Sequence, residues 1–101
     1  MSGVLGLLGL GFRGGKVVAG VDRVREGLQQ GKFPCVVVAA DASPRAVEKV
    51  VRLARGRGIR VITVTSAAAL GATLGKPPVM VAGVRDAALA AGLARASSHR
   101  S

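Results

Sequence analysis

The segment Cys35-Val36-Val37-Val38-Ala39-Ala40, followed by Asp41-Ala42-Ser43-Pro44, decides the fold. Its first six residues are apolar and rich in valine, which is typical of a strand buried on both faces of a sheet. Ser43 has a side chain that suits a helix N-cap, and Pro44 suits the first position of a helix. A buried strand that leads directly into a helix predicts an α/β domain.

The residues from Pro44 to about Arg57 follow the period of a helix. The face predicted to be buried consists of Val47, Val50, Val51 and Ala54. On the opposite face, Glu48 and Arg52 have the spacing of an i,i+4 ion pair. The basic residues of that face form either a solvated surface or a contact surface: Arg45, Lys49, Arg52 and Arg55.

The rest of the chain continues this alternation. Strands are predicted at 16–19, 60–64 and 79–84. Helices are predicted from Val21 to a stop at Gly31, over 67–73 after the cap Ser66, and from the cap Asp86 to about Arg95, with Gly27 as a weak point in the first of them. Residues 4–10 suit either a helix or a strand. The pattern predicts a single-domain three-layer α/β/α sandwich with a central mixed sheet of about four strands. The domain spans residues 1–95, and residues 96–101 are expected to be a flexible polar tail.

The composition excludes several classes of protein. The chain has 101 residues, a net charge of +10, one Cys, one His and no Trp or Tyr. Cys35 has no partner for an intramolecular disulfide and is expected to be a small buried hydrophobe, while His99 alone offers neither a metal site nor a catalytic triad. The positive charge favours polyanionic partners, nucleic acid above all. The scarcity of aromatic residues argues against recognition of single strands by base stacking.

No apolar run is long enough to cross a bilayer, and no signal peptide is expected. We therefore expect a cytoplasmic monomer with no membrane partner. We expect no catalytic residue, no metal and no cofactor, so that the protein is not an enzyme.

Gly9-Leu10-Gly11-Phe12-Arg13-Gly14 matches the G-x-G-x-x-G pattern of dinucleotide-binding domains. In such a domain the glycines allow the backbone to approach a pyrophosphate at a helix N-terminus. The other interpretation is a glycine-rich helix end and turn, because the residues after Gly14 do not open an apolar helix. Asp41 and Ser43 are similarly either catalytic residues or helix caps, and the caps are favoured.

Residues 15–24, Gly15-Lys16-Val17-Val18-Ala19-Gly20-Val21-Asp22-Arg23-Val24, are the most informative for function. A basic residue precedes a short strand, a glycine follows it, and a helix begins. The free N–H groups of a helix start attract phosphate, and a glycine lets another backbone come close. The side chains of Asp22 and Arg23, in the first turn, can reach base edges.

Four motifs in this order resemble the ribosomal-protein family of the L7Ae and L30e type, and most closely its small bacterial members. They are residues 7–13, Gly15-Lys16-Val17-Val18-Ala19-Gly20, residues 35–43, and Leu70-Gly71-Ala72-Thr73-Leu74-Gly75-Lys76. The resemblance covers about residues 5–93. It implies an α/β/α domain that binds kink-turn RNA and is associated with the ribosome.

The resemblance also implies which residues meet the RNA. A glycine and the first helical turn that contact tandem sheared G·A pairs correspond to Gly20, Val21, Asp22 and Arg23. A loop that packs on an extruded nucleotide corresponds to Lys76, Pro77, Pro78 and Val79, and a basic residue before the short strand corresponds to Lys16. With Lys16 and Lys76, the basic residues expected to neutralise phosphates are Arg13 and Lys32.

The strong archaeal binders have Asn-Glu where this chain has Asp22-Arg23, and Lys where it has Glu26. Asp22 can still accept a hydrogen bond from a base amino group, whereas Arg23 suits a guanine edge or a phosphate. Two alternatives to RNA binding remain open at this point. One is a nucleotide- or dinucleotide-binding domain built on Gly9, Gly11 and Gly14, and the other is a protein-interaction scaffold of the same fold.

Overall fold

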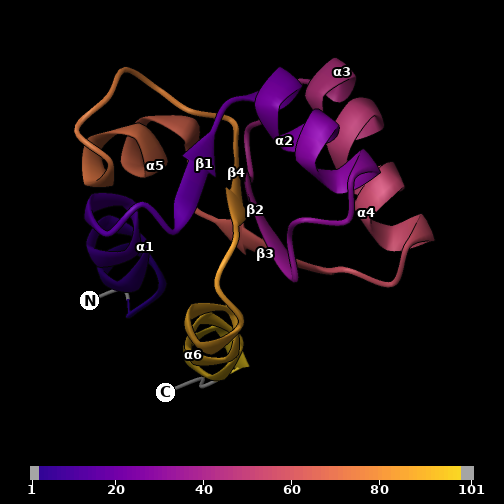
Figure 1. Cartoon of the computed structure of the whole chain (residues 1–101). Helices are drawn as coiled ribbons and strands as arrows, with labels where there is room; N and C mark the ends of the chain where they lie inside the picture. Colours follow the sequence, from indigo (N-terminus) through magenta and orange to yellow (C-terminus); the bar gives the residue numbers. More distant parts are fainter. Residues whose placement is uncertain (1–2, 99–101) are drawn as a thin grey trace.

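Four strands form one mixed sheet in the order β1-β4-β2-β3 (Figure 1). They are β1 (Val17–Ala19), β2 (Cys35–Ala39), β3 (Arg60–Val64) and β4 (Val81–Val84). The computed structural model describes residues 3–98. Strands β2 and β3 are parallel, while β4 is antiparallel to both β1 and β2. Strands β1, β2 and β3 therefore all run in one direction.

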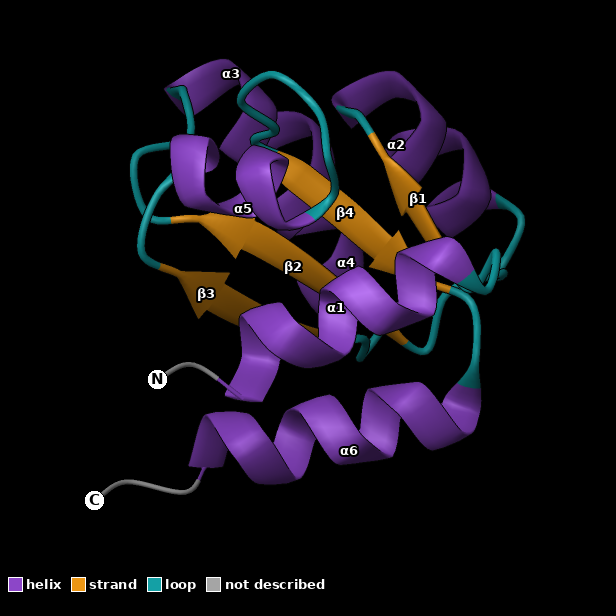
Figure 2. Cartoon of the chain, turned by 90° about the vertical axis from the view of Figure 1, so that its left-hand side faces the viewer, coloured by secondary structure: helices purple, strands orange, loops and turns teal. Residues whose placement is uncertain are grey.

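The strand register defines two edges of the sheet. Val17, Val84, Cys35 and Arg60 lie in one row across the four strands. The segments just beyond this row form what we call the amino edge, because β1, β2 and β3 begin there. The opposite side, where these three strands end and β4 begins, is the carboxyl edge. In Figure 2 the arrowheads of β2 and β3 point to the carboxyl edge.

Helices cover both faces of the sheet (Figures 1 and 2). One face holds α1 (Gly3–Arg13), α5 (Ala67–Thr73) and α6 (Ala87–Ser98). The other face holds α2 (Val21–Gln29) and a helical segment that consists of α3 (Pro44–Ala46), η1 (Val47–Val51) and α4 (Arg52–Gly56). This arrangement confirms the predicted single-domain α/β/α sandwich with a mixed four-stranded sheet.

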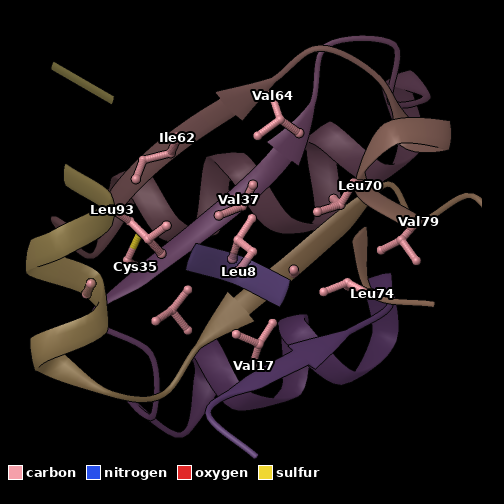
Figure 3. Packing of buried hydrophobic residues seen from close by; sticks show 13 residues of the cluster. Leu8, Val17, Cys35, Val37, Ile62, Val64, Leu70, Leu74, Val79 and Leu93 are labelled. Atoms are coloured by element: carbon pink, nitrogen blue, oxygen red, sulfur yellow. The ribbon is translucent and has the colours of Figure 1, made fainter. Parts of the chain in front are cut away.

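Alternate residues of β2 contribute to two apolar clusters. Cys35 and Val37 face Leu8, Leu70 and Leu93, which come from α1, α5 and α6 (Figure 3). Val36 and Val38 face the opposite way, into a cluster with Val24, Leu28, Phe33 and Val50. All five residues of β2 are buried, as its apolar composition predicts. Among the described residues, no polar or charged residue is buried.

The segment 44–56 is helical throughout, close to the predicted range. Ser43 Oγ accepts a hydrogen bond of 3.2 Å from the Ala46 N–H, and Pro44 is the first residue of the helix. In the middle, the Arg52 N–H bonds to the carbonyl of Val47, five residues back, so that the helix is locally widened. Arg52 and Glu48 form the predicted ion pair at 2.9 Å on the exposed face.

The glycine-rich start of the chain is a helix that packs closely. Gly9 and Gly11 are buried within α1, where a Cβ on Gly9 would lie 3.1 Å from the Thr73 carbonyl oxygen and one on Gly11 would overlap the Leu89 side chain. The G-x-G-x-x-G match thus lies inside and at the end of a helix. The dinucleotide interpretation is wrong, because that site needs the glycines between a strand and a helix N-terminus.

The C-terminal helix is longer than predicted. It begins after Asp86, whose Oδ2 accepts a hydrogen bond of 2.8 Å from the Leu89 N–H, and it continues to Ser98. Residues 96–98 are therefore helical, although we expected them to be part of a flexible tail. The remaining tail residues, His99 among them, lie outside the described part of the chain. The strand predicted at 79–84 begins two residues later, at Val81.

Candidate nucleic-acid interface

Helices α2, α3 and α5 all begin at the carboxyl edge, because each follows one of the three parallel strands (Figure 2). A helix start presents N–H groups without intrahelical partners and the positive end of the helix dipole. Ligands of open α/β sheets commonly bind at this edge. The carboxyl edge is therefore the first place to look for an anion site.

Side chains already occupy the starts of α3 and α5. Ser43 caps α3, and Ser66 Oγ accepts a hydrogen bond of 3.0 Å from the Ala69 N–H in α5. Asp41 Oδ1 accepts a bond of 2.7 Å from the Ala67 N–H, so it also caps α5. Asp41 and Ser43 are thus helix caps, although Asp41 caps a distant helix instead of the one that follows it.

The start of α2 has no side-chain cap. Gly20 is the N-cap residue, with φ 111° and ψ 143°, and no side chain bonds to the first turn. The first N–H to bond back into the helix belongs to Val24, which donates to the Gly20 carbonyl at 3.0 Å. The N–H groups of Val21, Asp22 and Arg23 are therefore available to a ligand. A Cβ on Gly20 would meet nothing within 4 Å, so the open space lies directly beside the turn.

The loop between α5 and β4 ends beside this helix start. The Gly20 N–H donates to the Val81 carbonyl at 3.1 Å, and the Ala39 N–H donates to the Met80 carbonyl at 2.8 Å. Met80 thus lies between the ends of β1 and β2. The turn at Gly20 and the Pro-containing loop, which the sequence analysis assigned to one site, are neighbours in the structure.

Within this loop, the apolar side chains do not all face outward. Pro77 and Pro78 are exposed, but Val79 is buried in the core, and its N–H donates to the Ala67 carbonyl at 3.0 Å. Val79 therefore anchors the loop and cannot offer the apolar platform that we expected of it. Met80 is 38% exposed and takes that outward position. The sequence analysis missed Met80, although a buried Val79 implies an exposed neighbour in an extended segment.

A hollow of about 200 Å³ lies between these elements. Its lining includes Val21 and Asp22 from α2, Ser43 and Arg45 at the start of α3, and Met80. Lys49 lines it as well, so two of the basic residues on the outer helix face point to this site. The hollow thus combines uncapped N–H groups, two cations, one carboxylate and an apolar side chain.

The remaining basic residues predicted for the site lie elsewhere. Arg13, Lys16 and Lys32 are in the turns of the amino edge, and about 13 Å of strand separates Lys16 from Gly20. Lys76 belongs to the Pro-containing loop but leans toward α1, with its Nζ 5.6 Å from the centroid of the Phe12 ring. The predicted set of residues is thus divided between the two edges of the sheet.

Arg23 faces a second hollow, of about 430 Å³. Lys32 and Arg85 line this hollow together with Arg23, and Glu26 is its acidic residue. Arg23 is therefore directed away from the hollow that Asp22 lines. Arg85, which follows β4 directly, was not among the predicted residues, and its place beside Lys16 follows only from the pairing of β1 with β4.

Few of the charges neutralise one another. Within residues 3–98, the Arg52–Glu48 contact is the one salt bridge, so no other Arg or Lys of this range has an ionic partner inside it. In the same part of the chain, no cluster of His, Cys, Asp and Glu has the arrangement of a metal site. None of the described helices combines the length and apolarity that a bilayer crossing needs.

Comparisons with known proteins agree with this architecture. The model of the ribosomal protein L7Ae/L30e/S12e/Gadd45 family matches residues 4–93. A protein of unknown function from Bacillus halodurans is similar in structure, with a TM-score of 0.92 at 28% identity over 98% of this chain and 100% of that chain. The 15.5kD RNA binding protein of Giardia lamblia has a TM-score of 0.79 at 25% identity, over 93% of this chain and 81% of that chain. Among curated proteins, none matches the chain.

The family match spans nearly all of the described residues, and the structural matches cover the same elements. Proteins of this family are mostly non-enzymatic and bind RNA, with kink-turn RNA among their targets. The chain therefore belongs to the ribosomal protein L7Ae/L30e/S12e/Gadd45 family.

Proposed function

We propose that this protein binds a kink-turn, or a similarly bent structured RNA, at the carboxyl edge and performs no catalysis. We further propose that it acts as a cytoplasmic monomer associated with the ribosome. The observation that carries the proposal is the uncapped start of α2 beside the exposed loop that ends at Met80. Both the family match and the RNA-binding relative from Giardia lamblia support it.

Each part of the carboxyl edge has a role in this proposal. The N–H groups of Val21 to Arg23 donate hydrogen bonds to a phosphate, which the glycine at position 20 allows to come close. The Asp22 carboxylate accepts a hydrogen bond from a base amino group. Arg45 and Lys49 neutralise neighbouring phosphates. Pro77, Pro78 and Met80 contact the face of a nucleotide that leaves the stack.

A binding titration with two RNAs tests the proposal. One RNA is a kink-turn hairpin, and the other is an uninterrupted duplex of the same length. Both titrations use the same salt concentration. We expect the kink-turn to bind at least about tenfold more tightly, a difference of about 1.4 kcal/mol. Equal affinity for the two RNAs would show that the protein binds polyanions without recognising the bend.

Matched variants test which part of the protein surface recognises the kink-turn. Arg45→Ala and Met80→Ala remove side chains that line the hollow at the carboxyl edge. Each is expected to reduce the ratio of kink-turn affinity to duplex affinity. Arg57→Ala removes the same charge from an exposed position at the amino edge and should not lower this ratio. If Arg57→Ala lowers the ratio as much as Arg45→Ala does, the site is not at the carboxyl edge.

A further inference from the structure

We propose that the amino edge is a second RNA-binding surface, which holds a phosphodiester backbone by charge. The protein would then contact two RNA segments at opposite edges of its sheet. This inference goes beyond the proposed function, because it concerns residues that the kink-turn site does not use.

The two edges differ sharply in charge. The turns of the carboxyl edge contain Asp22 and Asp41 as well as basic residues. Those of the amino edge contain a single acidic residue, Asp86, which is engaged as the cap of α6, while Glu26 of α2 lines the hollow beside them. The basic residues of the amino edge are all exposed, and none forms an ion pair within residues 3–98: Arg13, Lys16, Lys32, Arg55, Arg57, Arg60 and Arg85.

The turns before the parallel strands share one construction. Gly15, Gly31 and Gly58 have φ of 75°, 71° and 70°. The next N–H in each turn bonds to a carbonyl five residues back, at 2.8 Å for Lys16, 2.9 Å for Lys32 and 2.9 Å for Ile59. These are tight helix ends of the Schellman type. Each turn is therefore short and projects little beyond the end of its strand. Its basic side chains extend into solvent close to the first residue of that strand.

The strand register aligns these turns. Val17, Val84, Cys35 and Arg60 form one row, so the segments just outside them lie along a line. Four strands at a spacing of about 4.8 Å place the outer strands roughly 14 Å apart. At one end of this line, Arg23, Lys32 and Arg85 line the hollow of about 430 Å³, where Glu26 is the one acidic residue against these three cations. The result is a continuous basic strip with a recess.

The helix dipole does not account for this number of charges. A helix C-terminus has the equivalent of roughly half a negative charge. The end of α4, the turn after it and the first residue of β3 nevertheless carry Arg55, Arg57 and Arg60. Such like charges repel one another when no counter-charge is present. A polyanion that lies along the strip removes this repulsion.

The chemistry of the strip favours RNA backbone over other polyanions. A protein that lies on a membrane surface needs an apolar face, and the exposed large hydrophobic residues within 3–98 are Leu10 and Met80, neither of them in these turns. Base stacking needs exposed aromatic rings, whereas Phe33, the aromatic residue next to Lys32, is buried. Charge and shape remain, which is how A-form RNA duplexes are commonly recognised.

Two matched triple variants test the inference with an uninterrupted RNA duplex as the probe. The first, Lys32→Ala/Arg57→Ala/Arg60→Ala, removes charge from the amino edge. The second, Arg45→Ala/Lys49→Ala/Lys76→Ala, removes the same charge from the hollow at the carboxyl edge and from the Pro-containing loop. We expect the first to lose at least about tenfold in duplex affinity and its salt slope to fall by roughly 2 to 3. The second should keep duplex affinity within about twofold, since none of its residues lies in the turns of the amino edge.

Several outcomes would overturn the inference. They are an equal loss of duplex affinity in the two triple variants, or no loss of duplex affinity in the first. If the first variant keeps its duplex affinity but has a lower melting temperature, its basic residues serve only to stabilise the helix C-termini. Vesicles of anionic lipid that bind through the amino edge more tightly than the duplex does would assign the strip to a membrane. Circular dichroism of both variants checks that they are folded.

A ternary-complex experiment separates this inference from the proposed function. Protein saturated with a kink-turn hairpin should still bind a labelled duplex, and only the first triple variant should lose that second binding event. If the kink-turn shows no preference but duplex binding still depends on the amino edge, the inference holds and the proposed function fails. If the kink-turn is preferred and the first triple variant binds duplex normally, the reverse is true.

Discussion

Phe33 lies between two glycines, Gly27 of α2 and Gly83 of β4. A Cβ on Gly83 would be 2.8 Å from the ring atoms Cε2 and Cζ, and one on Gly27 would overlap the ring. The ring is buried and fills the space between the helix and the sheet. Gly27 is thus required for the packing of α2, whereas its helix propensity alone suggested a weak point.

Gly27→Ala is therefore expected to destabilise the protein by about 1–3 kcal/mol, because the added methyl group overpacks the core. Far-UV circular dichroism during urea unfolding measures the change, since the chain has no Trp or Tyr for fluorescence. Gly6→Ala is the control: a Cβ there meets nothing within 4 Å, and it should stabilise α1 by about 0.5–1 kcal/mol. Equal stabilisation by both changes would contradict the packing of Phe33 between the glycines.

Cys35 is buried at one end of β2, and burial raises the pKa of its thiol from 9.0 to about 11, against the smaller opposing effect of Arg60. At pH 8 the folded protein should not react with an aromatic disulfide reagent, and it should react fully after unfolding in urea. Between pH 9 and 11 the unfolded thiol loses its proton first, so stability should fall as pH rises through this range. Cys35→Ala should lack this part of the pH dependence, and an identical slope in both proteins would contradict it.

At the scale of elements, α5 holds the Pro-containing loop in place. Gly71 of α5 faces the loop so closely that a Cβ would be 2.7 Å from the Pro77 carbonyl carbon and 2.9 Å from the Lys76 oxygen. Both of these atoms belong to the backbone, which cannot move without displacing Pro77 and Pro78. The position of the loop beside α2 therefore depends on the absence of a side chain at residue 71.

Gly71→Ala is expected to displace the loop and to weaken kink-turn binding by about tenfold, equivalent to about 1.4 kcal/mol. Duplex binding should change little, because the amino edge is untouched. A titration of both RNAs measures the two effects. Ala72→Ser, at an exposed position of the same helix, is the control that should leave both affinities unchanged. Unchanged kink-turn binding in Gly71→Ala would separate the loop from the site.

Local patterns were sufficient to predict most elements. The buried valines of β2, the caps Ser43, Ser66 and Asp86 and the glycines after the helices mark strands and helix ends directly. Thr73, which packs against Gly9, and Ala67, whose N–H bonds to Asp41, lie far from their partners along the chain. Only the tertiary structure reveals these contacts. The same holds for the site. The family resemblance implied that Gly20 and the Pro-containing loop meet one RNA, and the two segments are neighbours in the structure, but the sequence did not show that Lys16 and Lys32 lie at the other edge.

At the scale of the whole molecule, charge repulsion is a persistent cost to stability. The net charge is +10, and the one ion pair within residues 3–98 is exposed. Salt screens repulsion between exposed charges and removes little attraction here. The melting temperature is therefore expected to rise as sodium chloride increases from about 10 to about 300 mM, over which the Debye length falls from roughly 30 Å to well below 10 Å. A fall in melting temperature over this range would contradict this charge balance.

Strand β4 comes late in the chain but lies in the interior of the sheet, between β1 and β2. A nascent polypeptide that has emerged only as far as Val64 contains β1, β2 and β3, yet β1 then has no neighbour with which to pair. The sheet closes only after residues 81–84 have left the exit tunnel of the translating ribosome. Closure of the sheet therefore waits for residues 81–84, and until then the valine-rich strands have unpaired edges that favour aggregation.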